Sequence, residues 1–398
     1  MWIRLLDKLL VQFVKKGQLV VEYPHGKIIA YGQTLDKKIK VKINNPRILR
    51  RLVVSPDLTL GEAYMDGDLV IQNDDIFGFL VLITQNLTNQ PDSWISRLLL
   101  FSNNSFLNSI KANAPSRSKS NVKHHYDLSP ELYSLFLDVD KQYSCAYFKN
   151  VDDTLEQAQE QKKHHIAKKL SLHPGMTVLD IGSGWGGMAI TLAKNYNVNV
   201  LGVTLSEEQQ KISQQRAINE GLEGKVEFKL MDYREDLSVF DRIVSVGMFE
   251  HVGVPNYKEY FRTIKNKLSP GGVALVHTIG RITPPGGTSP WIKKYIFPGG
   301  YIPALSEMVA AVEKNYLYIS DVEILRMHYA MTLAHWHQRF TENEERIKKI
   351  YDERFCRMWR YYLVASEISF RYYQQVVFQV QISKEQMTLP ITRDYLLK

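Results

Sequence analysis

A glycine-rich turn between a buried strand and a helix is the first feature of the sequence that can do chemistry. In the run VLDIGSGWGGMAIT, residues 178–191, Gly182, Gly184 and Gly187 fit the spacing G-x-G-x-x-G. Glycines at such a turn let a ligand approach the backbone closely, because no Cβ intrudes. The pattern indicates a nucleotide-type cofactor, but by itself it does not separate one cofactor from another.

The residues beside the turn separate NAD from S-adenosylmethionine. A dinucleotide site needs an acidic residue at the end of the second strand to bind the ribose hydroxyls. That strand ends in GVTLS, with Thr204 where the acid should stand. Asp180 instead lies two residues before the first glycine, an arrangement typical of class I methyltransferases. The sequence therefore favours S-adenosylmethionine.

These residues need a sheet that brings the ends of its strands together. From residue 160 onward, strand-like runs alternate with helical stretches, which predicts an α/β fold with a doubly wound (Rossmann-like) sheet of seven strands. The expected strands are MTVLDIG, VNVLGVTL, KVEFKLMD, DRIVSVGMF, GGVALVHTI, LYISDVEIL and QQVVFQVQI. The long aromatic segment between the last two predicts a helical insertion. Ligands of such a sheet bind beyond the carboxyl ends of the strands.

The first 50 residues carry the positive charge of the chain. They contain eleven Lys or Arg and three acidic residues, a net charge of +8 that equals the net charge of all 398 residues. Such a field attracts an anionic surface, either nucleic acid or anionic phospholipid. Residues 2–16 combine an apolar stripe with Lys and Arg on the other face, as in helices that lie at a membrane interface or pack on their own domain.

Composition divides the chain into three parts. We expect a smaller N-terminal α+β domain for membrane or lipid docking over 1–107, a polar linker over 108–123 and a catalytic domain over 124–398. No apolar run approaches the roughly 20 residues that span a bilayer, and the first residues lack a signal-peptide pattern. Two distant cysteines fit a reducing compartment. We therefore expect a cytoplasmic protein, peripherally associated with the inner face of the cell membrane.

Several longer motifs resemble those of the cyclopropane-fatty-acyl-phospholipid synthases. They are NVKHHYDLSPELYSLFLDVDKQYSCAYF, LDIGSGWGG, GVTLSEEQ, DYREDLSVFDRIVSVGMFEHVG, MWRYYLVASEISFR and, near the N-terminus, NPRILRRLVVSPDLTLGEAYMDGDL. The resemblance covers nearly the whole chain, including the N-terminal segment that the shorter mycolic acid cyclopropane synthases lack. It departs at Ser366, where many relatives have a cysteine, so a thiol cannot act there.

The resemblance implies transfer of the methyl carbon of S-adenosylmethionine to the cis double bond of a phospholipid acyl chain, which forms a cyclopropane ring. A carbocation on this route would lose a proton to an enzyme-bound bicarbonate ion. The groups implied to hold that ion are Cys145, Glu250, His277, the Ile279 backbone and Tyr329. Glu250 could orient His277, because both follow predicted strands at the carboxyl edge of the sheet. The resemblance also implies a homodimer.

The cofactor residues come partly from the glycine turn and partly from the resemblance. Tyr143 and Ser144 match residues that close over the methionine carboxylate, and Asp232 and Tyr233 are expected near the adenine. The full expected set is Tyr143, Ser144, Asp180, Gly182, Gly184, Gly187, Thr204, Leu205, Gln209, Asp232 and Tyr233.

Three other functions could use some of the same features. A nucleic-acid methyltransferase would use the basic end, but the fourth strand is followed by MFEHVG rather than an Asn/Asp-Pro-Pro-Tyr motif, so we expect no nucleic-acid partner. A lipid-binding protein without activity would not need the complete set of bicarbonate residues. A fatty-acyl methyltransferase with a methyl-branched product remains open. Neither His-Glu-x-x-His nor Cys-x-x-Cys spacing occurs, so we expect no metal.

Overall fold

The computed structural model describes residues 1–33, 38–88, 129–235 and 238–397. These residues form two compact units. Unit 1 comprises Met1–Asn108, Gly286–Pro298 and Leu333–Gln374, and unit 2 comprises Ser109–Pro285, Gly299–Thr332 and Gln375–Lys398, as far as they are described. The predicted linker, 108–123, lies outside the described residues, and the predicted domain boundaries stay a prediction. No helix in the described part of the chain is long and apolar enough to cross a bilayer.

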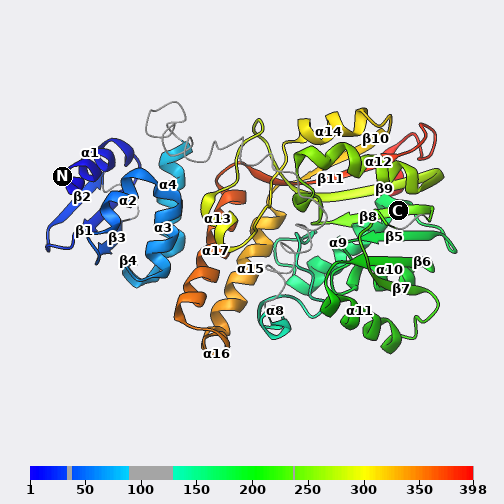
Figure 1. Cartoon of the computed structure of the whole chain (residues 1–398), viewed down its shortest axis with the longest axis horizontal. Helices are drawn as coiled ribbons and strands as arrows, with labels where there is room; N and C mark the ends of the chain where they lie inside the picture. Colours follow the sequence, from blue (N-terminus) through cyan, green and yellow to red (C-terminus); the bar gives the residue numbers. More distant parts are fainter. Residues whose placement is uncertain (34–37, 89–128, 236–237, 398) are drawn as a thin grey trace. The chain divides into compact units, whose positions relative to one another are not determined.

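Unit 1 begins with the α+β arrangement that the sequence predicts. Its four-stranded sheet has the order β2-β1-β3-β4. Strands β1 (Gln18–Glu22) and β3 (Lys38–Ile43) are parallel, whereas β2 (Ile28–Gly32) and β4 (Leu69–Ile71) pair antiparallel at the edges. The helices are α1 (Trp2–Phe13), α2 (Ile48–Val54), α3 (Pro56–Met65) and α4 (Ile76–Thr88), drawn in blue and cyan in Figure 1.

Helix α1 packs on unit 1 through one face only. Leu6 and Phe13 are buried, and Asp7 accepts a 2.8 Å hydrogen bond from the hydroxyl of Tyr31 in β2. The opposite face, with Arg4, Leu5, Lys8, Val11, Gln12 and Lys15, is exposed. The buried face shows that the helix packs on its own domain, and the membrane interface stays a prediction for the exposed face.

The predicted insertion is helical and belongs to unit 1. It consists of the C-terminal part of α15 (His328–Glu342), together with α16 (Glu344–Ile350) and α17 (Glu353–Arg371), and α17 packs against α3 and α4. Helix α13 (Pro290–Tyr295) joins them. Trp291 lies so close to Gly61 in α3 that a Cβ on Gly61 would be 2.3 Å from the indole nitrogen.

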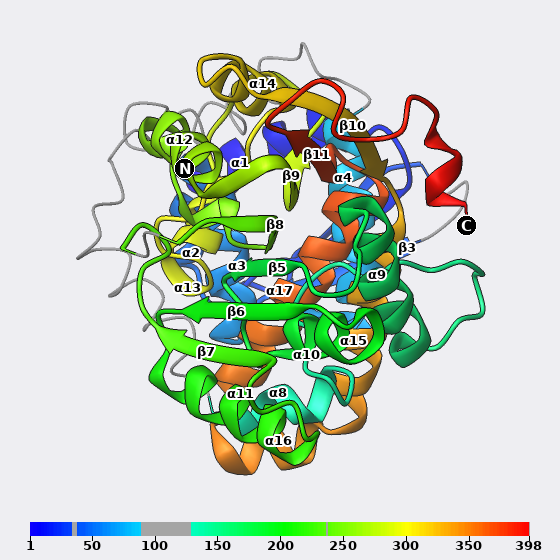
Figure 2. The same cartoon turned by 90° about the vertical axis from the view of Figure 1, so that its right-hand side faces the viewer.

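Unit 2 contains the predicted seven-stranded sheet, in the order β10-β11-β9-β8-β5-β6-β7 (Figure 2). Five neighbouring strands of this sheet are parallel to one another: β5 (Thr177–Ile181), β6 (Asn199–Thr204), β7 (Val226–Leu230), β8 (Phe240–Val246) and β9 (Leu268–Arg281). Strands β11 (Gln375–Ser383) and β10 (Tyr318–Leu325) complete the sheet antiparallel. The seven apolar runs correspond to these strands, which confirms the predicted fold class.

Helices cover both faces of this sheet, and each face has its own core. Helices α12 (Tyr257–Lys267) and α14 (Leu305–Glu313) pack against Leu179 and Ile181 of β5. Helices α9 (Leu155–Leu170), α10 (Gly187–Tyr196) and α11 (Glu207–Asn219) pack on the other face, against Val178. Side chains alternate along a strand, so Asp180 points to the same face as Val178, towards α9 and α10. A short helix, α8 (Pro130–Phe136), precedes α9.

Candidate cofactor pocket and catalytic residues

A pocket lies at the carboxyl edge of the unit 2 sheet, where β5, β6, β7 and β8 end. It holds about 880 Å³ of space between atoms, part of it open to solvent. Seven predicted cofactor residues line it: Gly182, Gly184, Thr204, Leu205, Gln209, Asp232 and Tyr233. The other four, Tyr143, Ser144, Asp180 and Gly187, are not among its lining residues.

The three glycines of the motif do different things. Gly184 has φ +55°, and a Cβ placed there would enter open space at the pocket. Gly182 has φ +80°, with the side chain of Met248 3.2 Å from an added Cβ. Gly187 instead gives room to another part of the chain, because its Cβ would lie 2.2 Å from the carboxylate of Asp140. Gly182 and Gly184 line the pocket, whereas Gly187 does not and stays a predicted cofactor residue.

Polar side chains of the pocket are fixed by one another. The Thr204 hydroxyl donates to Oε1 of Gln209 at 3.0 Å, and both residues are buried. Ser206 caps α11 by accepting from the Gln209 backbone N–H at 3.3 Å, as its position predicts. Asp232 accepts from Arg234 with both oxygens, at 2.8 and 2.5 Å. The negative charge of Asp232 is thus balanced by Arg234, which was not predicted to belong to the site.

Asp180 is a buried acid on the α9 face of β5. Burial raises the pKa of Asp180 to about 7, although the nearby Lys162 opposes the rise. Its Oδ2 has no hydrogen-bond partner among the described residues. The sequence places Asp180 beside the cofactor turn correctly, but the side chain points away from the residues that line the pocket.

Glu250 has the properties of a functional acid. It follows β8, in the short helix η2 (Phe249–His251), and its Oε1 accepts a 2.6 Å bond from the backbone N–H of Ile279 in β9. Burial raises the pKa of Glu250 to about 7, although that hydrogen bond opposes the shift. Oε2 is buried and has no hydrogen-bond partner among the described residues. A carboxyl poised near neutrality with one oxygen unused can exchange a proton with a ligand.

His277 is oriented by Gln379 rather than by Glu250. The two side chains lie in register on β9 and β11, and Nε2 of Gln379 is 3.1 Å from Nδ1 of His277. An amide nitrogen can only donate, so Nδ1 accepts and the ring proton belongs on Nε2. Burial lowers the pKa of His277 well below its usual value, and Lys162 and Lys169 lower it further. The imidazole is therefore neutral.

Cys145 lies beside α15, the helix that carries both Thr332 and Tyr329. The Thr332 hydroxyl accepts from the backbone N–H of Ala146 at 3.0 Å and also contacts the Cys145 thiol. Tyr329 lies three residues before Thr332 on α15, one helical turn away, and is buried. Burial raises the pKa of the Cys145 thiol, so this group is a hydrogen-bond donor rather than a thiolate.

Several residues of the site escaped sequence reasoning. Lys162 is fully buried in α9 and acts electrostatically on both Cys145 and His277. Gln379 comes from the last strand and carries no motif. His251 lines the pocket, and burial lowers its pKa to about 4, so it is neutral. His251 stands in the motif MFEHVG, whereas no motif singled out Lys162 or Gln379.

Known proteins resemble the chain over most of its length. Residues 113–380 match the family model of mycolic acid cyclopropane synthetase, and residues 5–93 match a domain of unknown function. The cyclopropane-fatty-acyl-phospholipid synthase of Escherichia coli K12 is 42% identical over 86% of this chain and 87% of its own length. A probable fatty acid methyltransferase of Pseudomonas putida is 35% identical, covering 84% of both chains.

A solved structure resembles about two thirds of the chain. Mycolic acid cyclopropane synthase CmaA1, complexed with SAH and CTAB, superimposes with a TM-score of 0.64 at 34% identity. The match covers 67% of this chain and 98% of that one.

Proposed function

This chain belongs to the mycolic acid cyclopropane synthetase family, and from this premise we propose that it converts cis-unsaturated acyl chains of phospholipids into cyclopropane acyl chains. The chain is an S-adenosylmethionine-dependent methyltransferase that modifies lipid acyl chains. The resemblance noted from the motifs is thereby confirmed. The ring product is the finer proposal, and the observation that carries it is the buried Glu250 with its unused oxygen.

The pocket fits S-adenosylmethionine. Gly184 leaves open space for a ligand, and Thr204 and Gln209 offer polar atoms after β6, where a ribose would lie. When bound, S-adenosylmethionine supplies an electrophilic methyl group, whose transfer to a double bond leaves a cationic carbon skeleton that closes to a ring on loss of a proton from the added methyl. We propose that Tyr143 and Ser144 contact the methionine carboxylate.

The proton requires a base, and we propose bicarbonate. Its fit rests on the Glu250 Oε2, an orphaned buried polar atom that can donate when protonated. Nε2 of neutral His277 and the Tyr329 hydroxyl are further donors suited to an anion, and the Cys145 thiol would join them by turning from the Ala146 carbonyl oxygen, to which it donates at 3.3 Å. The Ile279 N–H already donates to Glu250, so it holds the acid in place. A bicarbonate ion held by these residues would supply the base for that proton.

The decisive assay identifies the lipid product. Incubation with S-adenosylmethionine and vesicles of a cis-monounsaturated phospholipid should yield acyl chains one carbon heavier. Gas chromatography with mass spectrometry measures the mass, and upfield proton NMR signals identify a cyclopropane ring. A methyl-branched product would favour the alternative activity, that of a fatty-acyl methyltransferase without ring closure. An unchanged acyl chain would contradict both.

We propose that unit 1 docks on an anionic membrane surface through the exposed face of α1. This face presents Arg4 and Lys8 beside the exposed apolar side chains of Leu5 and Val11, a combination suited to a lipid interface. Each basic residue near an anionic leaflet contributes about 1 kcal/mol. We also keep the homodimer and the peripheral location at the inner membrane face as proposals, for which sedimentation and cell fractionation are the tests.

Substitution tests the docking face better than deletion of residues 1–16, because deletion would uncover the core around Leu6 and Phe13. Arg4→Gln with Lys8→Gln should weaken co-sedimentation with anionic vesicles by about tenfold or more at low salt, and the difference should shrink at high salt. Affinity for S-adenosylmethionine should not change. The control is Lys194→Gln with Lys229→Gln, two exposed lysines of unit 2. Equal losses in both pairs would contradict docking through α1.

A further inference from the structure

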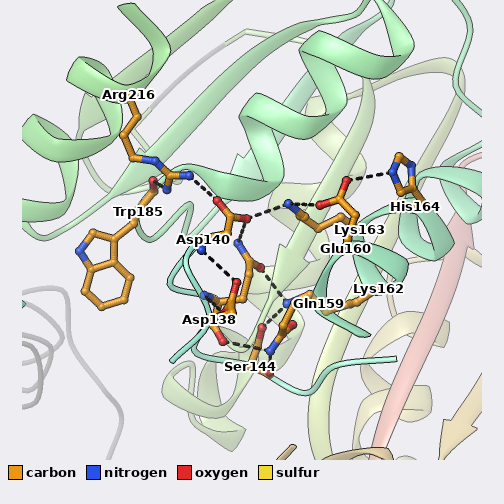
Figure 3. Close-up of polar contacts among 11 residues, drawn as sticks. Asp138, Asp140, Ser144, Gln159, Glu160, Lys162, Lys163, His164, Trp185 and Arg216 are labelled. Atoms are coloured by element: carbon orange, nitrogen blue, oxygen red, sulfur yellow. Dashed lines mark hydrogen bonds and ion pairs between the residues drawn. The ribbon is translucent and has the colours of Figure 1, made fainter. Parts of the chain in front are cut away.

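A buried ammonium group lies behind the segment that holds Ser144 and Cys145. Lys162 of α9 is 0% exposed, and its Nζ donates to Oγ of Ser144 at 2.8 Å and to Oε1 of Gln142 at 2.7 Å (Figure 3). Burial lowers the pKa of Lys162 to about 8, with Asp138 opposing the shift. The group is therefore mostly charged at neutral pH. A buried charge is costly unless it has partners, so this lysine needs an explanation.

The segment does not need Lys162 to keep its backbone in place. Asp138 accepts from the backbone N–H of Gln142 at 2.9 Å and of Asp140 at 3.1 Å. Gln159, one turn before Lys162 on α9, donates to the carbonyl oxygens of Gln142 and Ser144 at 3.2 and 3.0 Å. The backbone of residues 138–144 is thus held by other side chains, whereas Lys162 bonds only to side-chain atoms.

Asp140 gives this segment a second, independent anchor. Its carboxylate accepts from Lys163 of α9 at 2.8 Å and also pairs with Arg216 of α11, while it packs over Gly187 (Figure 3). Burial opposes ionisation of Asp140, but Lys163 and Arg216 outweigh it and lower the pKa. These ion pairs fasten the segment to α9 and α11 without any part played by Lys162.

The bond from Lys162 decides which way the Ser144 hydroxyl points. An ammonium group has only donors, so the serine oxygen must accept from it. The hydroxyl hydrogen of Ser144 is then left to donate to another group. The positive charge also polarises this O–H bond and strengthens it as a donor in the buried surroundings. A strong, oriented donor is what a carboxylate ligand requires.

We infer that Lys162 is a positioning residue that fixes the Ser144 hydroxyl as a donor to the methionine carboxylate of S-adenosylmethionine. This inference rests on the proposed function, in which Ser144 contacts that carboxylate. Lys162 acts on binding through Ser144 and through its own charge, without contacting the reacting atoms. Removing the ammonium group should therefore weaken recognition of the amino-acid part of the cofactor and leave recognition of the adenosine part intact.

Two ligands separate these parts. S-adenosylhomocysteine contains the carboxylate, whereas 5′-methylthioadenosine retains the adenosine and thioether and lacks the amino acid. Calorimetric titration of the full chain should show that Lys162→Met raises the Kd for S-adenosylhomocysteine about tenfold and the Kd for methylthioadenosine less than about twofold. Ser144→Ala should behave alike. The double variant should bind S-adenosylhomocysteine about as weakly as the weaker single variant, because the two residues act on the same bond.

The chain offers a matched control in Lys169→Met. Lys169 lies on the same helix and is equally buried, but it pairs with Glu323 at 2.5 Å and Asp321 at 3.6 Å of β10. Its loss should lower stability and leave the ratio of the two Kd values unchanged. Equal weakening of both ligands by Lys162→Met, or additive effects in the double variant, would overturn the inference. Failure of the unmodified protein to bind S-adenosylhomocysteine would instead overturn the proposed function.

Discussion

Replacing Glu250 with glutamine is expected to lower the rate of methyl transfer to lipid by about 1,000-fold, the range of a lost acid–base group. Glutamine keeps the oxygen that accepts the 2.6 Å bond from the Ile279 N–H, so the backbone around the site should not move. What it removes is the titratable oxygen, Oε2, which has no hydrogen-bond partner among the described residues. Incorporation of labelled methyl groups into vesicle lipids measures the rate.

The same substitution should make the protein more stable at neutral and alkaline pH. Burial raises the pKa of Glu250 from 4.5 to about 7, so between these values the folded state keeps a proton that the unfolded state has released. Stability therefore falls as the pH rises through this window, by about 3 kcal/mol in all. Glutamine carries no such cost. Thermal melts should show a higher Tm for Glu250→Gln than for the unmodified protein at pH 8 and a smaller difference at pH 4.5.

Both results need controls. Affinity for S-adenosylhomocysteine should be unchanged in Glu250→Gln, since Glu250 does not line the cofactor pocket. Glu259→Gln, which alters an exposed carboxylate of α12 paired with Arg262, should change neither rate nor pH dependence. Cys145→Ser should also bind cofactor and lose turnover. Rates near normal in both Glu250→Gln and Cys145→Ser would remove the bicarbonate site from the mechanism.

Gly184→Ala is expected to weaken S-adenosylmethionine binding by on the order of 100-fold, equivalent to about 3 kcal/mol. Its added methyl group meets no protein atom within 4 Å, so the folded protein accepts it, but the group occupies the space at the pocket that the ligand needs. The backbone strain of a non-glycine residue at φ +55° adds a stability loss of about 1–3 kcal/mol. Equilibrium dialysis with labelled cofactor measures the affinity.

Gly221→Ala separates this strain from the blocked space. Gly221 follows the end of α11 with φ +68°, an added Cβ meets nothing within 4 Å, and it does not line the pocket. Both variants should therefore lose similar stability in thermal melts, and only Gly184→Ala should lose cofactor affinity. Affinity retained in Gly184→Ala would show that the ligand does not approach the glycine turn as proposed.

The central strands of the unit 2 sheet were predictable because they are buried on both faces, whereas the edge strands β7 and β10 are partly exposed. A strand such as β5, with four of five residues buried, appears in the sequence as a continuous apolar run. The seven runs therefore identify the seven strands without knowledge of their partners. Pairing is different, since it depends on contacts between distant residues. No local signal in 18–43 predicts that β1 lies parallel to β3 while β2 pairs on its other side.

The lysines of α9 show why part of the site was not predictable. The run QKKHHIAKK suggests a solvated helix face, because lysine is almost never fully buried unless it is paired. Lys162, Lys163 and Lys169 are nevertheless buried. Their partners, among them Ser144, Asp140 and Glu323, come from other parts of the chain and cannot be identified from the helix itself.

The surroundings of Gly187 were not predictable for a related reason. The spacing G-x-G-x-x-G is a pattern of backbone shape, and it gives no information about what fills the space beside each glycine. At Gly187 that neighbour is Asp140, forty-seven residues earlier in the chain. The spacing of the glycines thus predicted the turn. Only the tertiary structure shows that the side chain of Asp140 lies beside the third glycine.

The pairing of Gln379 with His277 has a consequence for the order in which the protein is made. Residues 181–256 supply every group that lines the cofactor pocket, so a growing chain contains the whole pocket lining long before synthesis ends. The imidazole acquires its partner only when β11, at the end of the chain, inserts between β9 and β10. A nascent chain still lacking that strand has the groups that line the pocket but not the amide that orients His277, so the proposed catalytic site is completed last.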